Sequence, residues 1–163
     1  MNSLYARFSS RVAKTTTTQR PRFIPMKILL LEKTPKSARE TLETLRKLDV
    51  SATVEWCSSV DDALASLRAS KGAPFSALLF DLSTDVEGAG GIIARATRLD
   101  VLGKTAVIAI SDSNSNQCRA TALARDAQGF LPKPLDPKRL QEMLTKRRLY
   151  WELRELPTRL DEY

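Results

Sequence analysis

The chain has 163 residues, of which 42% are hydrophobic and 28% charged, a composition typical of a globular protein with one domain. It contains no histidine, which excludes catalytic systems built on a histidine base, most catalytic zinc sites and a role as a histidine phosphodonor. No apolar run approaches the roughly 20 residues needed to cross a bilayer, so we predict no transmembrane segment.

The net charge of +7 is concentrated at the N-terminus. Residues 1–25 hold five basic residues and no acidic one, whereas residues 26–163 hold 21 basic and 19 acidic residues. Serine, threonine and proline are frequent in the same stretch, so we expect a flexible basic tail over residues 1–25. Such a tail is also compatible with an organellar presequence or with a contact to an anionic partner.

From residue 26 onward, short apolar runs alternate with amphipathic helical patterns. We predict strands at 28–31, 52–56, 75–80, 106–110 and 129–131. The helices between them are expected to begin near residues 34, 59, 92, 115 and 136, and the apolar face of the third is expected to include Leu99. Five strands alternating with five helices predict a flavodoxin-like (βα)5 α/β fold, in which helices cover both faces of a five-stranded doubly wound parallel sheet.

Polar residues stand where the predicted strands end. The first strand ends at Glu32 and Lys33, the third at Asp81, the fourth at Ser111 and the fifth at Lys133. The carboxyl ends of parallel strands lie at one edge of a sheet, and this edge is where such folds bind ligands and react. We therefore expect a carboxylate, a hydroxyl and an ammonium group to meet there.

Over residues 26–148 the sequence resembles the receiver domain of two-component response regulators, the CheY-like family. The resemblance rests on the acidic end of the first strand in KILLLEKTP, on Asp81 in ALLFDLS, on Ser111 in AVIAIS and on the Lys-Pro of FLPKP. Asp81 and Ser111 are 30 residues apart, and Ser111 and Lys133 are 22 apart, close to the spacing in that family.

The resemblance implies a role for each matching residue. Asp81 would be the phosphoacceptor, Lys133 would pair with its carboxylate and then with the phosphoryl oxygens, and Ser111 would donate its hydroxyl to the phosphoryl group. Phe130 stands where the family keeps the aromatic residue that changes rotamer with Ser111. A downstream protein would read the change on the surface of the fourth helix, fifth strand and fifth helix.

The expected Mg²⁺ site departs from the family pattern. Its ligands would be Glu32, Asp81 and the backbone carbonyl of Ser83, but Lys33 replaces the second of two adjacent acids, which weakens the site. Lys33 could instead pair with Asp81 and hold the site in a constitutive state. In the loop after Asp81, either Asp85 or Glu87 could reach back to a metal.

Two other patterns bear on function. Gly88, Gly90 and Gly91 lack the remaining residues of a nucleotide-binding loop, so we interpret them as a loop beside the acceptor. The two cysteines, Cys57 and Cys118, are expected to be buried or half-buried thiols of a reducing compartment.

The last helix continues past the receiver domain into a C-terminal helical extension over residues 149–163. Its apolar positions could form a homodimer, dock a partner or fold back on the domain, and they are Leu149, Leu153 and Leu156. Basic residues line the extension and could attract an anionic ligand, but acidic residues between them make nucleic acid an unfavoured partner.

Three functions are compatible with these observations. The first is an atypical single-domain receiver in a two-component phosphorelay, cytoplasmic and not an enzyme, with Asp81 phosphorylated by a sensor histidine kinase or a phosphotransfer protein. The alternative is a phosphorylation-independent pseudo-receiver, a scaffold or adaptor in which Glu32, Lys33, Asp81 and Lys133 form a fixed ion network. A less favoured possibility is a hydrolase or nucleotide-binding enzyme on the same fold.

Overall fold

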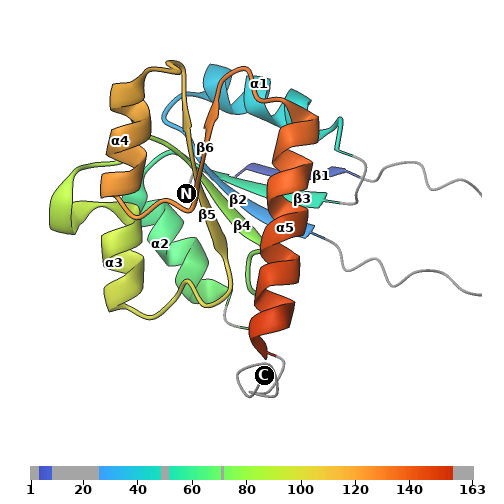
Figure 1. The fold of residues 1–163 in the computed structure, drawn as a ribbon, viewed down its shortest axis with the longest axis vertical. Coiled ribbons are helices and arrows are strands. Elements are labelled where there is room, and N and C mark those ends of the chain that lie inside the picture. The colour runs from blue at the N-terminus through green and yellow to red at the C-terminus, as the bar shows by residue number, and fades with distance from the viewer. Residues whose placement is uncertain (1–3, 9–25, 49–51, 71, 156–163) are drawn as a thin grey trace, which may run out of the picture.

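The computed structural model describes residues 4–8, 26–48, 52–70 and 72–155. Five strands form the predicted parallel sheet: β2 (Met26–Leu31), β3 (Ala52–Cys57), β4 (Ala77–Asp81), β5 (Ala106–Ser111) and β6 (Gly129–Pro132). Their order across the sheet is β3-β2-β4-β5-β6, and every neighbouring pair among them is parallel. The flavodoxin-like α/β fold is therefore confirmed (Figure 1).

Five α-helices connect and follow these strands in the described part of the chain: α1 (Pro35–Leu45), α2 (Val60–Ala69), α3 (Ile92–Arg98), α4 (Asn116–Ala124) and α5 (Pro137–Glu155). Side chains fix several of their starts, because Thr34, Ser59 and Ser115 each accept a hydrogen bond from the backbone N–H three residues ahead. A short 3-10 turn, Gly88–Gly90, precedes α3. The boundaries agree with the predicted ones to within a few residues.

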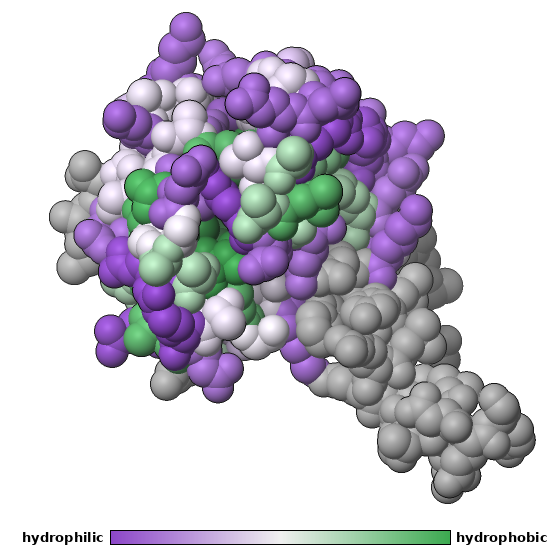
Figure 2. All heavy atoms as spheres, turned by 60° about the vertical axis from the view of Figure 1, so that its left-hand side comes forward, coloured by the Kyte–Doolittle hydropathy of each residue, from purple (hydrophilic) through white to green (hydrophobic). Residues whose placement is uncertain are grey.

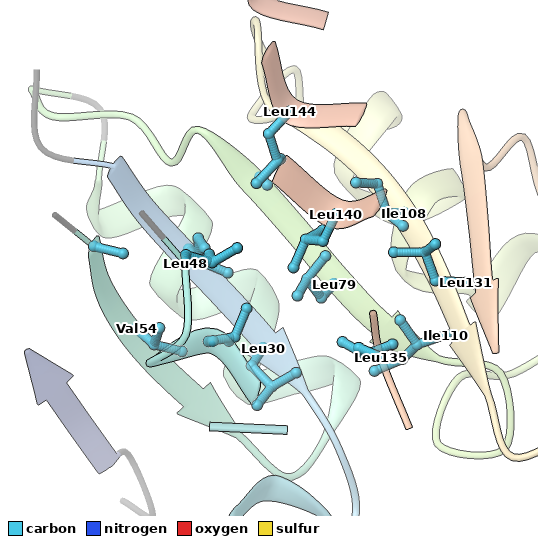
Figure 3. Close-up of a cluster of buried hydrophobic side chains, with 14 of the residues drawn as sticks. Leu30, Leu48, Val54, Leu79, Ile108, Ile110, Leu131, Leu135, Leu140 and Leu144 are labelled. Carbon is cyan, nitrogen blue, oxygen red and sulfur yellow. The ribbon is translucent and has the colours of Figure 1, made fainter. Parts of the chain in front are cut away.

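The sheet is buried on both faces. Ile28 and Leu30 of β2 point into a core that α1 and α5 cover, whereas Leu29 and Leu31 point into a second core beneath α2, α3 and α4. Figure 3 shows the first of these clusters, with Leu140 of α5 over the middle of the sheet. All four of these β2 side chains are fully buried, which explains why the strand is a continuous apolar run rather than an alternating one.

An additional strand was not predicted from the sequence. Leu4–Phe8 forms β1, which pairs antiparallel with β3 at the edge of the sheet, with Leu4 opposite Trp56 and Phe8 opposite Ala52. The expectation of a flexible tail is therefore wrong for Leu4–Phe8, because the open edge of β3 offers backbone partners to this segment. Residues 9–25 lie outside the described residues.

One predicted core position is also corrected. Leu99 was expected on the buried face of the third helix, but α3 ends at Arg98 and the side chain of Leu99 is 45% exposed. Val86 and Leu123 are the other large hydrophobic side chains that are exposed in the described part of the chain. Figure 2 brings forward the side on which α3 and α4 lie, and hydrophobic surface gathers there between hydrophilic side chains.

The last helix runs continuously to Glu155, as expected for an extended C-terminal helix. The side chains of Leu149 and Leu153, and all of Leu156, lie outside what the structure describes, so the proposed partner surface stays a prediction. Among the described helices, none is both long enough and apolar enough to span a membrane.

Candidate functional site

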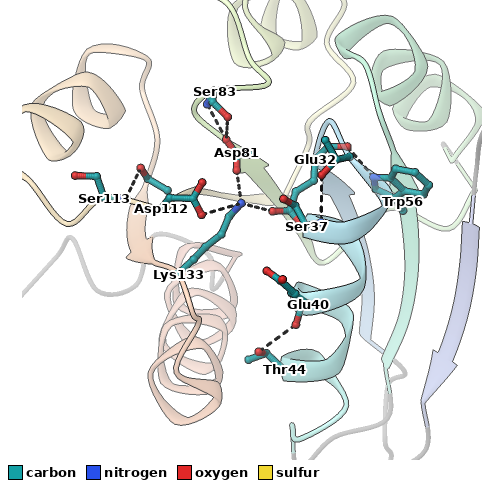
Figure 4. A network of polar contacts seen from close by, with 12 residues as sticks. Glu32, Ser37, Glu40, Thr44, Trp56, Asp81, Ser83, Asp112, Ser113 and Lys133 are labelled. Carbon is teal, nitrogen blue, oxygen red and sulfur yellow. Dashed lines mark hydrogen bonds and ion pairs between the residues drawn. The ribbon is translucent and has the colours of Figure 1, made fainter.

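Three side chains from different strands meet at the carboxyl edge of the sheet. Glu32 directly follows β2, Asp81 is the last residue of β4, and Lys133 directly follows β6. Strands β2 and β4 are neighbours, and the long Lys133 side chain reaches toward both of them from beyond β5 (Figure 4). The strand ends thus bring together the two acids and the base that the sequence placed there.

Lys133 is the centre of this cluster. Its ammonium group forms ion pairs with the carboxylates of both Glu32 and Asp81, and it also lies 3.9 Å from Oδ1 of Asp112. The Lys133 side chain is only 11% exposed, so bulk water screens these contacts weakly. Burial lowers the pKa of this ammonium, but the hydrogen bonds and charges of Asp81 and Glu32 outweigh burial and raise the pKa overall.

Both carboxylate oxygens of Asp81 are occupied. Oδ2 accepts a hydrogen bond from Lys133, and Oδ1 accepts two from Ser83, one from the backbone N–H at 2.7 Å and one from the hydroxyl at 2.5 Å. Burial raises the pKa of Asp81, but these donors outweigh it, so its pKa is lower than the ordinary value. Asp81 is therefore held as an ionised carboxylate.

Glu32 differs from Asp81 in its surroundings. The residue is fully buried, and its carboxylate contacts the Lys133 ammonium and the Thr41 side chain without a well-aligned hydrogen bond. Burial removes the Glu32 carboxyl from water and raises its pKa, and this effect is larger than the lowering caused by Lys133. The indole N–H of Trp56 donates to the Glu32 backbone carbonyl at 2.7 Å and fixes the chain at this point.

We infer that these residues are a poor site for a Mg²⁺ ion. The described part of the chain contains no group of three or more His, Cys, Asp or Glu side chains that could hold a metal. Mg²⁺ binds with several of its waters, yet neither carboxylate oxygen of Glu32 is open to solvent. The ammonium group of Lys133 already lies against both acids, which leaves them little unbalanced charge to attract a divalent ion.

Two sequence-based alternatives for this site are corrected by the structure. Lys33 does not pair with Asp81, because its side chain is exposed and the cation on Asp81 is Lys133. Asp85 does not reach back to the site either. Its side chain, which is 1% exposed, accepts a hydrogen bond from the backbone N–H of Ile92 at 2.8 Å and pairs with Arg125.

Arg125 forms a second buried ion pair that the sequence did not reveal. It extends from the C-terminal end of α4, where its guanidinium donates to the Leu82 carbonyl at 3.0 Å and to Oδ2 of Asp85 at 3.4 Å. The pair joins α4 to the loop after Asp81, and Asp85 in turn caps α3. The two residues are 40 positions apart, so no local pattern could have predicted their contact.

Ser111 and Phe130 both contact α4. The Ser111 hydroxyl accepts a hydrogen bond from the Ser113 N–H at 3.1 Å and donates to Sγ of Cys118 at 3.7 Å. Phe130 is half-buried, and the guanidinium of Arg119 lies over its ring at 5.2 Å from the centroid. The structure thus connects both residues to α4, and neither appears in the Asp81 contacts described above.

The two cysteines are placed as predicted, Cys57 buried and Cys118 half-buried, and both are free thiols. Burial raises the pKa of Cys57 to about 11. The pKa of Cys118 is lowered by hydrogen bonds from the Ser115 and Ser111 hydroxyls.

The chain shares its fold with receiver domains of response regulators. It is similar to a CheY-like receiver domain from Methanospirillum hungatei, with 20% identity over 77% of this chain and 98% of that one and a TM-score of 0.58. It is also similar to the receiver domain of a putative Luxo repressor protein from Vibrio parahaemolyticus, with 18% identity, coverage of 81% and 98% and a TM-score of 0.60.

A third similar structure is the chemotaxis response regulator CheY4 of Vibrio cholerae, with 22% identity over 76% of this chain and 98% of that one and a TM-score of 0.58. No family model and no curated protein matches the sequence. The receiver fold is therefore shown by structure, at a level of sequence identity that leaves the function to be argued from the site.

Proposed function

We propose that the chain is a receiver-fold signalling module that acts by protein contact and does not depend on phosphorylation, which makes it a binding protein rather than an enzyme. The observation that carries the proposal is the single ammonium group of Lys133, which pairs with both Glu32 and Asp81. An internal cation there already contacts the two acids that a metal ion would need as ligands, while Lys33 stands where the family keeps a further acid.

The charges of the cluster support this reading. Burial shifts Glu32 toward its neutral form, while Asp81 stays ionised and Lys133 stays protonated. The Lys133 ammonium thus offsets part of the charge of both acids, which weakens the attraction of this edge for an added divalent ion. Through these ion pairs, Lys133 connects the ends of β2, β4 and β6 in a closed network, by which we mean that the charged groups contact one another and not an added ion.

The state of Asp81 supports it as well. To form an acyl phosphate, a carboxylate oxygen must attack phosphorus in line while the bond from phosphorus to the donor breaks. Both oxygens of Asp81 are engaged by Lys133 and Ser83, and stabilising the carboxylate in this way lowers its nucleophilicity.

One observation favours a second candidate, a receiver in which Asp81 is phosphorylated. Asp81 is ionised and contacts Lys133, and Ser83 beside it is exposed, so small movements of the loop would open one carboxylate oxygen. A sensor histidine kinase or a phosphotransfer protein would then be the donor, and a downstream protein the receiver of the signal.

The glycine loop does not support a nucleotide-binding enzyme. The backbone N–H of Gly91 donates to the Gly88 carbonyl, and that of Ile92 donates to Asp85, so these donors are not directed to a phosphate. An added Cβ at Gly91 would lie 2.7 Å from the Val86 carbonyl oxygen, which explains the glycine by close packing of the loop.

The test is intact-mass measurement after incubation with acetyl phosphate and Mg²⁺. We expect no phosphoryl adduct on the wild-type protein. The matched variants are Asp81→Asn, which removes the acceptor, and Lys33→Asp, which restores the second acid at an exposed position. Circular dichroism on each variant establishes that it is folded.

An adduct on the wild type that is lost in Asp81→Asn would overturn the proposal in favour of the phosphorylated receiver. An adduct that only Lys33→Asp acquires would support a phosphorylation-independent wild type, and would show that the missing acid, not the Lys133 contacts, prevents phosphorylation. No adduct on either protein would support it too, and would show that restoring the acid at position 33 is not enough to allow phosphorylation.

Mg²⁺ binding gives an independent measurement. Trp56 contacts the Glu32 backbone, so its fluorescence reports on the site. In a Trp151→Phe background, where Trp56 is the remaining tryptophan, we expect no change in emission up to millimolar Mg²⁺. Saturable quenching that Asp81→Asn abolishes would show a metal site and contradict the closed network.

A further inference from the structure

We propose that the first turn of α4 holds both Ser111 and Phe130 in place, and that Arg119 is the residue that positions the Phe130 ring. The inference rests on the proposed function, because it explains how the surface formed by α4 and β6 keeps one conformation without a signal from Asp81. Two consecutive residues of α4, Cys118 and Arg119, make the contacts that carry it.

The first contact restrains Ser111. Its hydroxyl donates to Sγ of Cys118 and accepts from the Ser113 N–H, so both its donor and one acceptor position are used within β5, the following loop and α4. Ser111 is 8% exposed, and little room is left for other partners. A movement of the hydroxyl toward another group at the sheet edge would break two hydrogen bonds.

The second contact restrains Phe130. The Arg119 guanidinium lies over the ring, 5.2 Å from its centroid, within the range of a favourable cation–π interaction. Phe130 also packs against the core beneath α2, α3 and α4. The ring therefore contacts both an apolar core and a cation, and turning away from both would lose the two contacts.

The position of Arg119 is itself fixed. Its Nη2 donates to Oδ1 of Asn114 at 2.6 Å, in the loop that joins Ser111 to α4. A guanidinium can donate from its edge and stack with its face at the same time, which a lysine ammonium cannot do. Arg119 thus connects the loop after β5 to the aromatic ring on β6.

The arrangement separates α4 and β6 from the acidic site. Ser111 and Phe130 are held through Cys118 and Arg119, whereas Asp81 is held by Lys133 and Ser83. Arg119 is a positioning residue in this scheme, because it acts through Phe130, whereas the Asp81 carboxylate is bound by Lys133 and Ser83. We expect the Phe130 ring to respond to changes at Arg119 and not to changes at Ser111.

Fluorine NMR on protein labelled with para-fluorophenylalanine tests this assignment. The chain has five phenylalanines, and Phe130→Leu identifies the resonance of Phe130. We expect Arg119→Ala to move this resonance toward the free amino acid and to increase its solvent isotope shift. The population of the outward ring should rise about three-fold, as expected for loss of an exposed cation–π contact.

Three further variants sharpen the test. Arg119→Lys keeps the charge but loses the planar guanidinium, so it should give part of the Phe130 shift seen in Arg119→Ala. Asn114→Ala should give a smaller shift than Arg119→Ala, in the same direction. Arg98→Ala is the matched control, because Arg98 is also an exposed arginine on a helix but bonds to the Ala89 carbonyl. Arg98→Ala and Ser111→Ala should leave the Phe130 resonance in place.

An unchanged Phe130 resonance in Arg119→Ala, or an equal shift in Arg98→Ala, would overturn the inference. Its failure is distinguishable from that of the proposed function, because the NMR measurement uses no phosphoryl donor. If acetyl phosphate labels Asp81 while Arg119→Ala still moves the ring, the proposed function fails and the role of Arg119 stands. If Asp81 is not labelled and the ring does not respond to Arg119, only the role of Arg119 is lost.

Discussion

Two buried acid–base clusters lie at opposite ends of the segment 81–85, and they are satisfied to different degrees. At Asp85, one oxygen caps α3 through the Ile92 N–H and the other pairs with Arg125. At the sheet edge, Lys133 forms ion pairs with two carboxylates. Among the described residues, the carboxylate oxygens of Glu32 have no well-aligned hydrogen bond. One base pairs with one acid in the first cluster, whereas one base pairs with two acids in the second.

The difference shows how burial alone fails to identify a functional group. Asp85 is as buried as Asp81, yet each of its contacts joins secondary-structure elements, which is the behaviour of a structural ion pair. The cluster around Lys133 stands at the carboxyl edge of a parallel sheet and holds two buried acids against one base. An excess of acid at such an edge is a feature that packing does not require.

The largest expected effect on stability comes from removing the Lys133 ammonium, which pairs with both Glu32 and Asp81. Lys133→Met leaves Glu32 and Asp81 buried together without a counter-charge, and we expect it to lower the free energy of unfolding by about 3–5 kcal/mol. Urea denaturation near neutral pH measures this. Lys33→Met removes an exposed lysine from the same edge and should change stability by less than about 0.5 kcal/mol. Similar losses in the two variants would contradict the central role of Lys133.

Breaking the ion pair between Asp85 and Arg125 should lower the free energy of unfolding by less than removing Lys133 does. The Arg125 side chain is 14% exposed and keeps the Leu82 carbonyl as a partner. We expect Asp85→Ala to cost about 2–3 kcal/mol in urea denaturation, since it removes both the ion pair and the cap of α3. Asp85→Asn keeps an acceptor for the Ile92 N–H and should cost less. Equal losses in both variants would show that the cap contributes nothing.

The two acids bound to Lys133 should affect stability with opposite signs. Asp81 has a lowered pKa in the folded protein, so its ionised form stabilises the fold above its ordinary value of 3.8. We expect Asp81→Asn to cost about 1–2 kcal/mol near neutral pH, and this cost to disappear as the pH falls below 3.8 and the folded protein takes up the proton.

Glu32 has a raised pKa, so its contribution is fully present below its ordinary value of 4.5 and is lost as the pH rises through the folded value. We therefore expect Glu32→Gln to increase stability by about 1 kcal/mol near neutral pH and to have no effect in acid. Urea denaturation of both variants across this pH range checks the two signs together. A loss of stability in Glu32→Gln near neutral pH would show that both acids carry charge in the folded protein.

The smallest effect should come from an exposed ion pair. Arg95 on α3 and Asp61 on α2 are 2.7 Å apart, but the Asp61 side chain is 81% exposed and that of Arg95 36%. Water screens such a pair, so we expect Asp61→Asn to change the unfolding free energy by less than about 0.5 kcal/mol. Thermal unfolding at low and high salt measures it, and a loss as large as that of Asp85→Ala would remove the distinction between buried and exposed pairs.

Local patterns in the sequence predicted most of the fold. A strand buried on both faces must be a continuous apolar run, as at Leu29 and Leu30, and helices with one buried face must repeat as α1 and α2 do. The strand β1 was missed because Leu4–Phe8 is stabilised by pairing with β3, a contact between residues about 50 positions apart. Leu99 was misplaced because the helical period gives no indication that α3 ends one residue earlier.

The site was predictable only in part. Asp81, Lys133 and Glu32 could be expected to meet, because the ends of parallel strands lie together whatever the side chains are. The contacts of Arg125 with Asp85 and of Arg119 with Phe130 could not, because each depends on how α4 packs against a neighbouring element. The basic residues of α4 give no signal in the sequence that separates them from solvated charges.

The sequence by itself determined the order of strands and helices, and with it the set of acids and bases at the edge of the sheet. Only the tertiary structure decided which base neutralises which acid. Lys33 is the neighbour of Glu32 in the chain, yet Glu32 is buried and Lys33 is exposed, whereas Lys133 contacts both acids. The reason is geometric, because successive residues of an extended chain point to opposite sides, so a side chain 101 positions away in sequence lies closer to Glu32 than the next one does.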